Sequence, residues 1–220
     1  MIAAIIPARL ASTRLPGKVL KEINDRTLLA HVIARAKVIP GINAIIVATT
    51  TDDEDGAVAQ EATREGARVF RGDVVNVLDR TYQAAREHGA STIVRLAADC
   101  PLLDPVLAGQ VLARFTMGDC DYASNVFPAT YPDGLDVEVL SFSALERAWK
   151  DATTELQREA VTPYIWERPD EFRCGVVTHR TYLRHLKWSV DDAEDFARVE
   201  AIFTALGVRT FDWGSALAVA

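Results

Sequence analysis

The sequence predicts an α/β protein with a Rossmann-like, doubly wound and mostly parallel sheet. Two observations lead to this fold class: short apolar runs alternate with segments of helical periodicity, and Gly or Pro closes most of these segments. The expected strands are residues 1–6, 43–49, 67–70 and 92–98, and the expected helices between them are residues 27–38, 53–65 and 76–88. This alternating order implies parallel strands joined by right-handed crossovers.

The second half of the chain, after a helix expected over residues 105–115, breaks this rhythm. We expect strands at 121–125, 135–140 and 172–178, helices at 143–152 and 156–167, and a last helix ending at Leu206. The run at 135–140 alternates polar and apolar residues, which predicts a half-exposed strand. We interpret residues 121–185 as a small α+β subdomain inserted over the sheet, which serves acceptor binding as a lid or forms a dimer contact.

Composition limits the protein class. The 220 residues, 49% hydrophobic and 25% charged, fit one globular domain over residues 1–220. A net charge of −7 argues against nonspecific nucleic-acid binding. Three cysteines at wide spacing give no disulfide framework or zinc site. No apolar run has the length of a membrane span and Met1 begins a strand, so we expect no membrane partner and a cytoplasmic protein.

A basic loop directly follows the first expected strand. It carries Arg9, Arg14 and Lys18 together with the hydroxyls of Ser12 and Thr13. Ligands of open parallel sheets bind beyond the carboxyl ends of the strands, so these cations are placed for a phosphate chain. The loop is not a Walker motif, because that motif needs Gly at 12 and a hydroxyl residue at 19. The alternative is a solvated surface loop without a ligand.

Two carboxylates are candidate Mg²⁺ ligands. Asp99 ends the fourth expected strand, at the sheet edge of the basic loop, and Asp191 ends a later extended segment. Mg²⁺ in proteins commonly binds one or two carboxylates plus substrate phosphates. The alternative for both is helix capping, and for Asp192, with Asp195 three residues later, capping is the favoured interpretation.

The basic stretch, residues 5–18, resembles the opening of a known family. Its pattern Ile-Ile-Pro-Ala-Arg-x-x-Ser-Thr-Arg-Leu-Pro-Gly-Lys is similar to that of the cytidylyltransferases that make CMP-activated acidic sugars, of the 3-deoxy-manno-octulosonate and acylneuraminate type. The chain most resembles the spore-coat polysaccharide branch, and the resemblance implies a fold of the nucleotide-diphospho-sugar transferase type. The resemblance implies transfer of CMP from CTP to an acidic or amino sugar, with pyrophosphate released, in surface polysaccharide biosynthesis. It also implies catalytic roles for Arg9, Arg14, Lys18 and Asp99.

Further motifs extend this resemblance to the nucleotide and the metal. Residues 95–104 resemble the family pattern R-x-T-G-D-C-P-L-I-D, whose first Asp binds the metal and corresponds to Asp99, and Asp191 falls in a stretch similar to V-D-x-x-E-D. Ala97 and Ala98 replace the usual Thr and Gly. The nucleotide-binding residues that the resemblance implies are Ala8, Arg9, Ser12, Lys18, Arg71, Asp79, Arg80 and Ala98. For the Asp79–Arg80 pair, a solvated helix surface or an anchor for the basic loop are the alternatives.

The acceptor-binding residues implied by the resemblance are Asn125, Tyr131, Asp136 and Glu138, around a run similar to Y-P-D-G-L-D-V-E. Because side chains alternate along a strand, we expect Asp136 and Glu138 on one face, where two carboxylates suit an amino or hydroxyl acceptor. We also expect a homodimer, because Phe127, Tyr131, Leu135 and Trp149 are apolar residues in or near this region.

Two rival functions remain at this point. A nucleotide-sugar-dependent glycosyltransferase is suggested by the D-x-D triplet of Asp119 and Asp121, although this triplet precedes its strand and should lie on the sheet edge opposite the basic loop. The other rival is a nucleotide- or sugar-binding module without turnover, which the loss of a metal ligand would favour.

Overall fold

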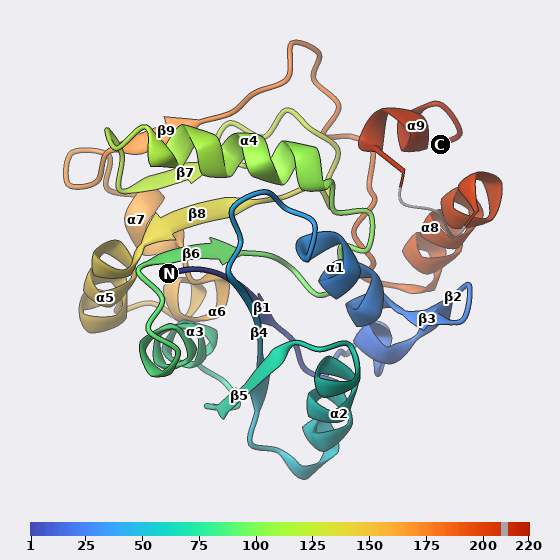
Figure 1. Cartoon of the computed structure of the whole chain (residues 1–220), viewed down its shortest axis with the longest axis horizontal. Helices are drawn as coiled ribbons and strands as arrows, with labels where there is room; N and C mark the ends of the chain where they lie inside the picture. Colours follow the sequence, from blue (N-terminus) through green and yellow to red (C-terminus); the bar gives the residue numbers. More distant parts are fainter. Residues whose placement is uncertain (208–210) are drawn as a thin grey trace.

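A seven-stranded sheet crosses the molecule in a computed structural model that describes residues 1–207 and 211–220 (Figure 1). Its strands, in chain order, are β1 (Ile2–Pro7), β4 (Ala44–Thr50), β5 (Arg68–Gly72), β6 (Thr92–Arg95), β7 (Tyr122–Ser124), β8 (Glu138–Ser141) and β9 (Cys174–Val176). Their order in space is β5-β4-β1-β6-β8-β7-β9. Both pairings of β8 are antiparallel, and the other four described pairings in this sheet are parallel. The expected doubly wound, mostly parallel sheet is therefore confirmed.

Helices cover both faces of the sheet, which explains why the central strands are continuous apolar runs. In β1, Ala4 and Ile6 face one helical layer, and Ala3 and Ile5 face the other. The first layer consists of α1 (Leu28–Ala36), α2 (Gly56–Arg64) and α4 (Pro105–Thr116). The second consists of α3 (Val77–Glu87), α5 (Phe142–Asp151), α6 (Glu155–Ala160) and α7 (Pro163–Trp166).

A smaller apolar cluster lies beside the sheet, around the buried Trp188. It includes residues of α8 (Ala193–Leu206), α9 (Trp213–Leu217) and the hairpin of β2 (Glu22–Ile23) and β3 (Arg26–Thr27). Two 3-10 turns, η1 (Lys18–Leu20) and η2 (Asp53–Asp55), complete the described elements. The sequence pattern did not predict the hairpin, whose turn residues Asn24 and Asp25 have positive φ angles, or α9.

The strand expected over 92–98 ends at Arg95, and two further expected boundaries are wrong for local reasons. The helix expected over 156–167 is two helices, because Val161 adopts φ 74° and ends α6 before Pro163 begins α7. The strand expected over 135–140 starts only at Glu138. It is mostly buried rather than half-exposed, since it lies inside the sheet between β6 and β7.

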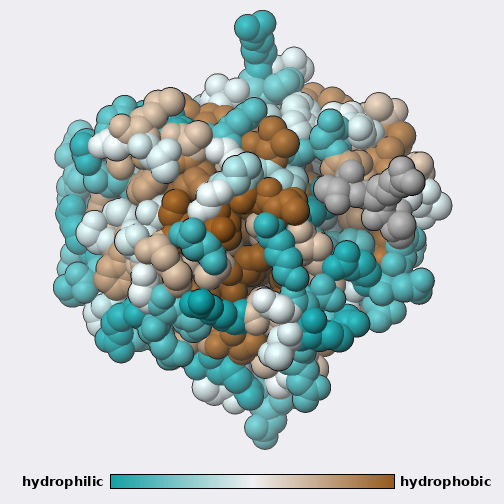
Figure 2. Space-filling model, in the orientation of Figure 1, coloured by the Kyte–Doolittle hydropathy of each residue, from teal (hydrophilic) through white to brown (hydrophobic). Residues whose placement is uncertain are grey.

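Residues 121–185 complete the sheet instead of forming a layer over it. They supply β7, β8 and β9 to one half of the sheet and α5, α6 and α7 to the second helical layer. This corrects the expected position of the inserted region. On the face shown in Figure 2, hydrophobic residues gather near the centre and hydrophilic residues surround them. Within the described chain, no helix combines the length and apolar character needed to cross a membrane.

Candidate active site

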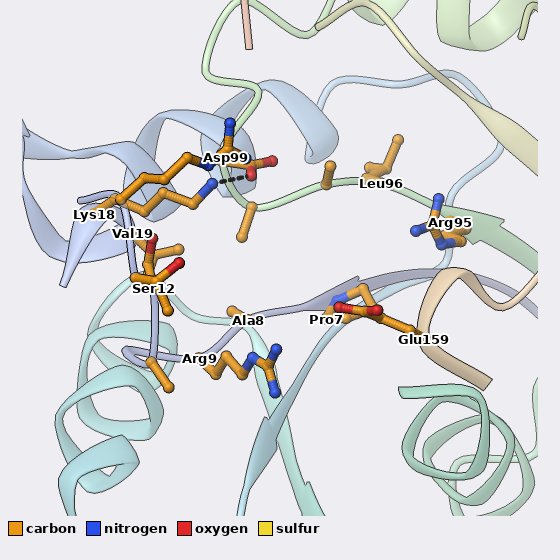
Figure 3. Close-up of a pocket in the computed structure, with 15 residues that line it drawn as sticks. Pro7, Ala8, Arg9, Ser12, Lys18, Val19, Arg95, Leu96, Asp99 and Glu159 are labelled. Atoms are coloured by element: carbon orange, nitrogen blue, oxygen red, sulfur yellow. Dashed lines mark hydrogen bonds and ion pairs between the residues drawn. The ribbon is translucent and has the colours of Figure 1, made fainter. Parts of the chain in front are cut away.

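A cavity of about 510 Å³ lies at the carboxyl ends of β1 and β6 (Figure 3). It is lined by residues 7–9, 11–14, 18 and 19 after β1, by residues 95–99 after β6, and by Glu159 of α6. Lys18 and Asp99 lie at one end of it, and Arg95 and Glu159 lie at the other. The basic loop and Asp99 therefore lie together at the carboxyl ends of the strands, as the sequence predicted.

Two long-range contacts hold the basic loop in place. The Leu10 amide donates a 2.7 Å hydrogen bond to the buried carboxylate of Asp55, and the Arg9 guanidinium donates to the Val74 carbonyl at 3.2 Å. The loop then turns through Gly17, whose φ of 67° is left-handed, and enters η1. Both contacts tie the start of the loop, at Arg9 and Leu10, to segments that follow β4 and β5.

Lys18 lies where two carboxylates converge. Its Nζ is 2.5 Å from Asp99 Oδ2, 3.2 Å from Asp191 Oδ1 and 2.8 Å from the Val190 carbonyl oxygen. Burial by itself would lower the pKa of Lys18, but the two carboxylates offset this and raise it. The ammonium therefore remains charged at neutral pH. The Val190 amide donates to the Asp99 carbonyl at 2.9 Å, which fixes the two carboxylate-bearing segments side by side.

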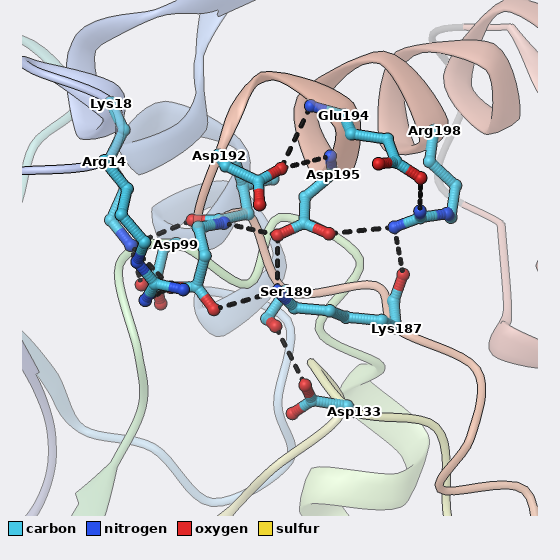
Figure 4. Close-up of polar contacts among 12 residues, drawn as sticks. Arg14, Lys18, Asp99, Asp133, Lys187, Ser189, Asp192, Glu194, Asp195 and Arg198 are labelled. Carbon is cyan, nitrogen blue, oxygen red and sulfur yellow. Dashed lines mark hydrogen bonds and ion pairs between the residues drawn. The ribbon is translucent and has the colours of Figure 1, made fainter.

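Figure 4 shows charged side chains that lead from Arg14 and Lys18 to Asp195 and Arg198 of α8. Asp191 pairs with the cations at the start of this chain of charges. Its carboxylate accepts from Arg14 at 2.9 Å and from Lys187 at 3.1 Å, besides Lys18. Burial raises its pKa, but Lys187 and Lys18 outweigh burial and lower it overall. The buried Asp195 carboxylate in turn accepts from Lys187 at 2.5 Å and from the Asp191 amide at 3.0 Å.

Asp192, the neighbour of Asp191, caps α8 as predicted. Its Oδ1 accepts from the amides of Glu194 and Asp195, both at 3.0 Å. Adjacent aspartates therefore have different surroundings: Asp191 lies among three cations, whereas Asp192 satisfies the first turn of a helix.

Three residues predicted to bind the nucleotide contact protein groups outside the cavity. Arg71 donates to the carbonyls of Thr50 and Asp52, and Asp79 accepts from Trp149 Nε1 at 2.8 Å. Arg80 is 1% exposed and donates to the carbonyls of Ala48 and Asp73. Burial, with a smaller effect of Arg9, lowers the pKa of Arg80 to about 10.

Arg80 is therefore corrected to a structural role, because it anchors the segment after β5. The remaining predicted nucleotide residues, Ala8, Arg9, Ser12, Lys18 and Ala98, all line the cavity.

The residues predicted to bind the acceptor contact other groups of the protein in this structure. Asn125 is buried and bonds to the Leu135 carbonyl and the Val137 amide, both at 2.8 Å. Tyr131 is buried beside Trp213, with ring centroids 5.5 Å apart. These two side chains stabilise the chain around the β7–β8 connection.

The two predicted acceptor carboxylates are already neutralised. Glu138 is 5% exposed, forms an ion pair with Arg95, and accepts from Tyr122 at 2.7 Å and from Thr162 at 2.5 Å. Asp136 precedes β8 and forms an ion pair with Arg184. Burial raises the pKa of Asp136, and Arg184 only partly offsets this. We predicted that Asp136 and Glu138 would lie on one face of a strand. This prediction is wrong, because β8 begins at Glu138 and Asp136 lies outside it.

Four other residues of the site were not predicted. Arg95 and Glu159 line the cavity, Asp55 anchors the basic loop, and Lys187 holds Asp191. The sequence did contain a signal for Arg95, because this residue ends β6 and begins the motif of residues 95–104 that contains Asp99. The other three are charged residues in polar segments, where nothing in the local pattern distinguishes them from solvated residues.

Comparison with known proteins identifies the family. Residues 3–205 match the family described as Cytidylyltransferase. The chain belongs to this family. It is accordingly a CTP-dependent nucleotidyltransferase, and the resemblance seen in residues 5–18 is confirmed.

Individual relatives agree with this assignment. The cytidylyltransferase is 38% identical over 199 residues to an uncharacterized protein of Methanocaldococcus jannaschii, covering 89% of this chain and 80% of the relative. It is 30% identical over 217 residues to the spore coat polysaccharide biosynthesis protein SpsF of Bacillus subtilis, covering 94% and 88%. A solved cytidylyltransferase from Leptospira borgpetersenii superposes with a TM-score of 0.94 at 26% identity, covering 99% and 92%.

Proposed function

We propose that this cytidylyltransferase transfers CMP from CTP to a sugar, with release of pyrophosphate, in the synthesis of a surface polysaccharide. The observation that carries the proposal is the cavity in which the basic loop and Asp99 meet. Relatives named for 3-deoxy-manno-octulosonate cytidylyltransferase and for spore coat polysaccharide biosynthesis support a sugar as the acceptor.

The chain's own cations would carry most of the catalysis. In such a reaction an acceptor oxygen attacks the α-phosphorus in line, the bond to the bridging oxygen breaks, and negative charge develops on the pyrophosphate. Arg9, Arg14 and Lys18 are attached to one loop and would bind the phosphate oxygens as that charge grows. Their contribution is positioning and electrostatic stabilisation, without a covalent intermediate.

The carboxylates fit a divalent cation, for which we propose Mg²⁺. Asp99, Asp191 and the Val190 carbonyl already surround one cationic group, the Lys18 ammonium, with three oxygen atoms. Among residues 1–207 and 211–220, no three His, Cys, Asp or Glu side chains are placed to hold a metal ion by themselves, so substrate phosphates would supply further ligands. When bound, the metal neutralises charge on the phosphates.

The rival glycosyltransferase function loses its main support. Asp119 forms an ion pair with Arg114 at 2.5 Å, and Asp121 forms one with Arg173 at 2.9 Å. Both precede β7, which runs parallel to β9 and antiparallel to β8. Both carboxylates therefore have cationic partners, and they lie on the sheet edge opposite the cavity.

Ligand-dependent thermal unfolding tests the proposed function. A ligand that binds only the folded protein raises its melting temperature. We expect CTP with Mg²⁺ to raise the melting temperature more than UTP, GTP or ATP with Mg²⁺, and more than CTP with a chelator. Equal shifts with all four nucleotides, or no shift with any, would contradict the proposal.

We also propose a homodimer. Fewer of the apolar residues named from the sequence are exposed for its interface than expected. Tyr131 and Leu135 are buried, but Phe127 is 53% exposed and stacks on Trp166 at 4.6 Å. Leu156 is also exposed. Light scattering should return twice the monomer mass, and Phe127→Asp should shift the protein toward the monomer. A monomer mass for the wild-type protein at high concentration would contradict the proposed dimer.

A further inference from the structure

The Lys18 ammonium occupies the point at which the two proposed metal ligands meet. Its three contacts are to Asp99 Oδ2, Asp191 Oδ1 and the Val190 carbonyl, at 2.5, 3.2 and 2.8 Å. Its side chain is 13% exposed, so these oxygen atoms have largely replaced water around it. A metal that uses both carboxylates therefore competes with Lys18 for the same oxygen atoms.

We infer that Lys18 holds the metal site in the nucleotide-free enzyme and leaves it when the triphosphate arrives. This inference rests on the proposed function, since it uses the same two carboxylates and the same cation. Metal and triphosphate each then need Lys18 to change partners. The metal needs it to leave the carboxylates, and the phosphate needs it to move toward the cavity.

Thermodynamic coupling follows from this exchange. A metal that binds alone leaves a desolvated ammonium without its carboxylate partners, and a triphosphate that binds alone leaves two carboxylates without their cation. When both bind, Lys18 pairs with phosphate and the carboxylates pair with the metal. Each ligand therefore raises the affinity of the other, and this coupling is reciprocal.

Neighbouring charges make Lys18, rather than Arg14 or Lys187, the group that must move. Arg14 forms an ion pair with Asp191 Oδ1, and its side chain is 62% exposed. Lys187 contacts Asp191 Oδ2 and remains fixed by the buried Asp195. Among these three cations, Lys18 alone bridges Asp191 and Asp99.

The test measures Mn²⁺ binding in the absence of nucleotide, by electron paramagnetic resonance, in wild type, Lys18→Met and Lys18→Gln. We expect both variants to bind Mn²⁺ about tenfold to a hundredfold more tightly than wild type, the range that charge-assisted hydrogen bonds correspond to. Calorimetry should show the opposite change for CTP with Mg²⁺, whose affinity should fall in both variants. A folding defect would weaken the binding of both ligands, so tighter Mn²⁺ binding together with weaker CTP binding in one variant cannot come from misfolding.

The control is Lys21→Met. Lys21 is exposed and lies three residues from Lys18, and its replacement by Met removes the same charge. It should bind Mn²⁺ and CTP as wild type does. Lys18→Gln keeps a hydrogen-bond donor for the carboxylates, so the test survives if Lys18→Met does not fold.

Two failures can be distinguished. Unchanged or weaker nucleotide-free Mn²⁺ binding in both Lys18 variants would overturn the inference. A wild type that binds Mn²⁺ neither alone nor with CTP would instead remove the metal site of the proposed function, and the inference with it.

Discussion

The two sides of the site were predicted from the same kind of evidence but differ in structure. On the phosphate side, comprising residues 8–18, Asp99 and Asp191, polar groups face a cavity or meet at its edge. On the acceptor side, comprising residues 125–138, the predicted side chains are buried or bonded to other protein groups. A motif on the phosphate side thus leaves polar groups open to a cavity, whereas one on the acceptor side places its polar groups in contacts within the protein.

The difference has a physical cause. The phosphate side lies at strand ends, where side chains leave the sheet and cannot be covered by a neighbouring strand. The acceptor side runs into β8, whose neighbours β6 and β7 supply partners on both sides. A carboxylate there must be paired, because an uncompensated buried charge is costly.

The largest expected effect is on the acceptor side. Replacing Glu138 with Ala removes the buried carboxylate that pairs with the half-buried Arg95 and accepts hydrogen bonds from the buried hydroxyls of Tyr122 and Thr162. We expect the free energy of unfolding to fall by about 3–5 kcal/mol, measured by denaturant unfolding. If the variant had native stability and its only defect were a raised KM for the sugar, the result would show that Glu138 binds the acceptor directly.

The next effect is on catalysis. Replacing Asp99 or Asp191 with Asn removes a charged metal ligand, and we expect pyrophosphate release to slow by about a hundredfold or more while folding survives. Asp192→Asn is the matched control, because Asn caps helices about as well as Asp and this carboxylate serves α8. Rates near those of wild type in both Asp99→Asn and Asp191→Asn would refute a shared metal site.

A smaller effect separates two arginines that the sequence treated alike. Arg9 lines the cavity, so Arg9→Ala should weaken CTP binding by about 1.5–3 kcal/mol in a calorimetric titration. Arg71 binds the carbonyls of Thr50 and Asp52, so Arg71→Ala should leave CTP affinity within about twofold. Equal losses of CTP affinity in the two variants would show that Arg71 also contributes to nucleotide binding.

The smallest effect concerns the D-x-D triplet. The Asp119 side chain is 63% exposed and pairs with Arg114, and water and salt screen such an exposed ion pair so that it contributes little to stability. Asp119→Asn should therefore change the melting temperature little and leave pyrophosphate release at the wild-type rate. Loss of turnover would reopen the glycosyltransferase interpretation.

The sequence by itself determined the fold class, the cavity edge and the cations of the basic loop. These features depend on local patterns: apolar runs bounded by turns predict buried strands, and strand ends meet at one edge of a parallel sheet. The capping role of Asp192 was also local, since its partners lie two and three residues away.

Only the tertiary structure decided which polar residues remain available to a ligand. Glu138 finds Arg95 across 43 residues of chain, and Asp136 finds Arg184 across 48. Lys18 finds Asp99 and Asp191 across 81 and 173. Sequence periodicity reports the face on which a side chain lies, but the partner that neutralises a buried charge comes from another part of the chain, so its identity is fixed only when the strands assemble.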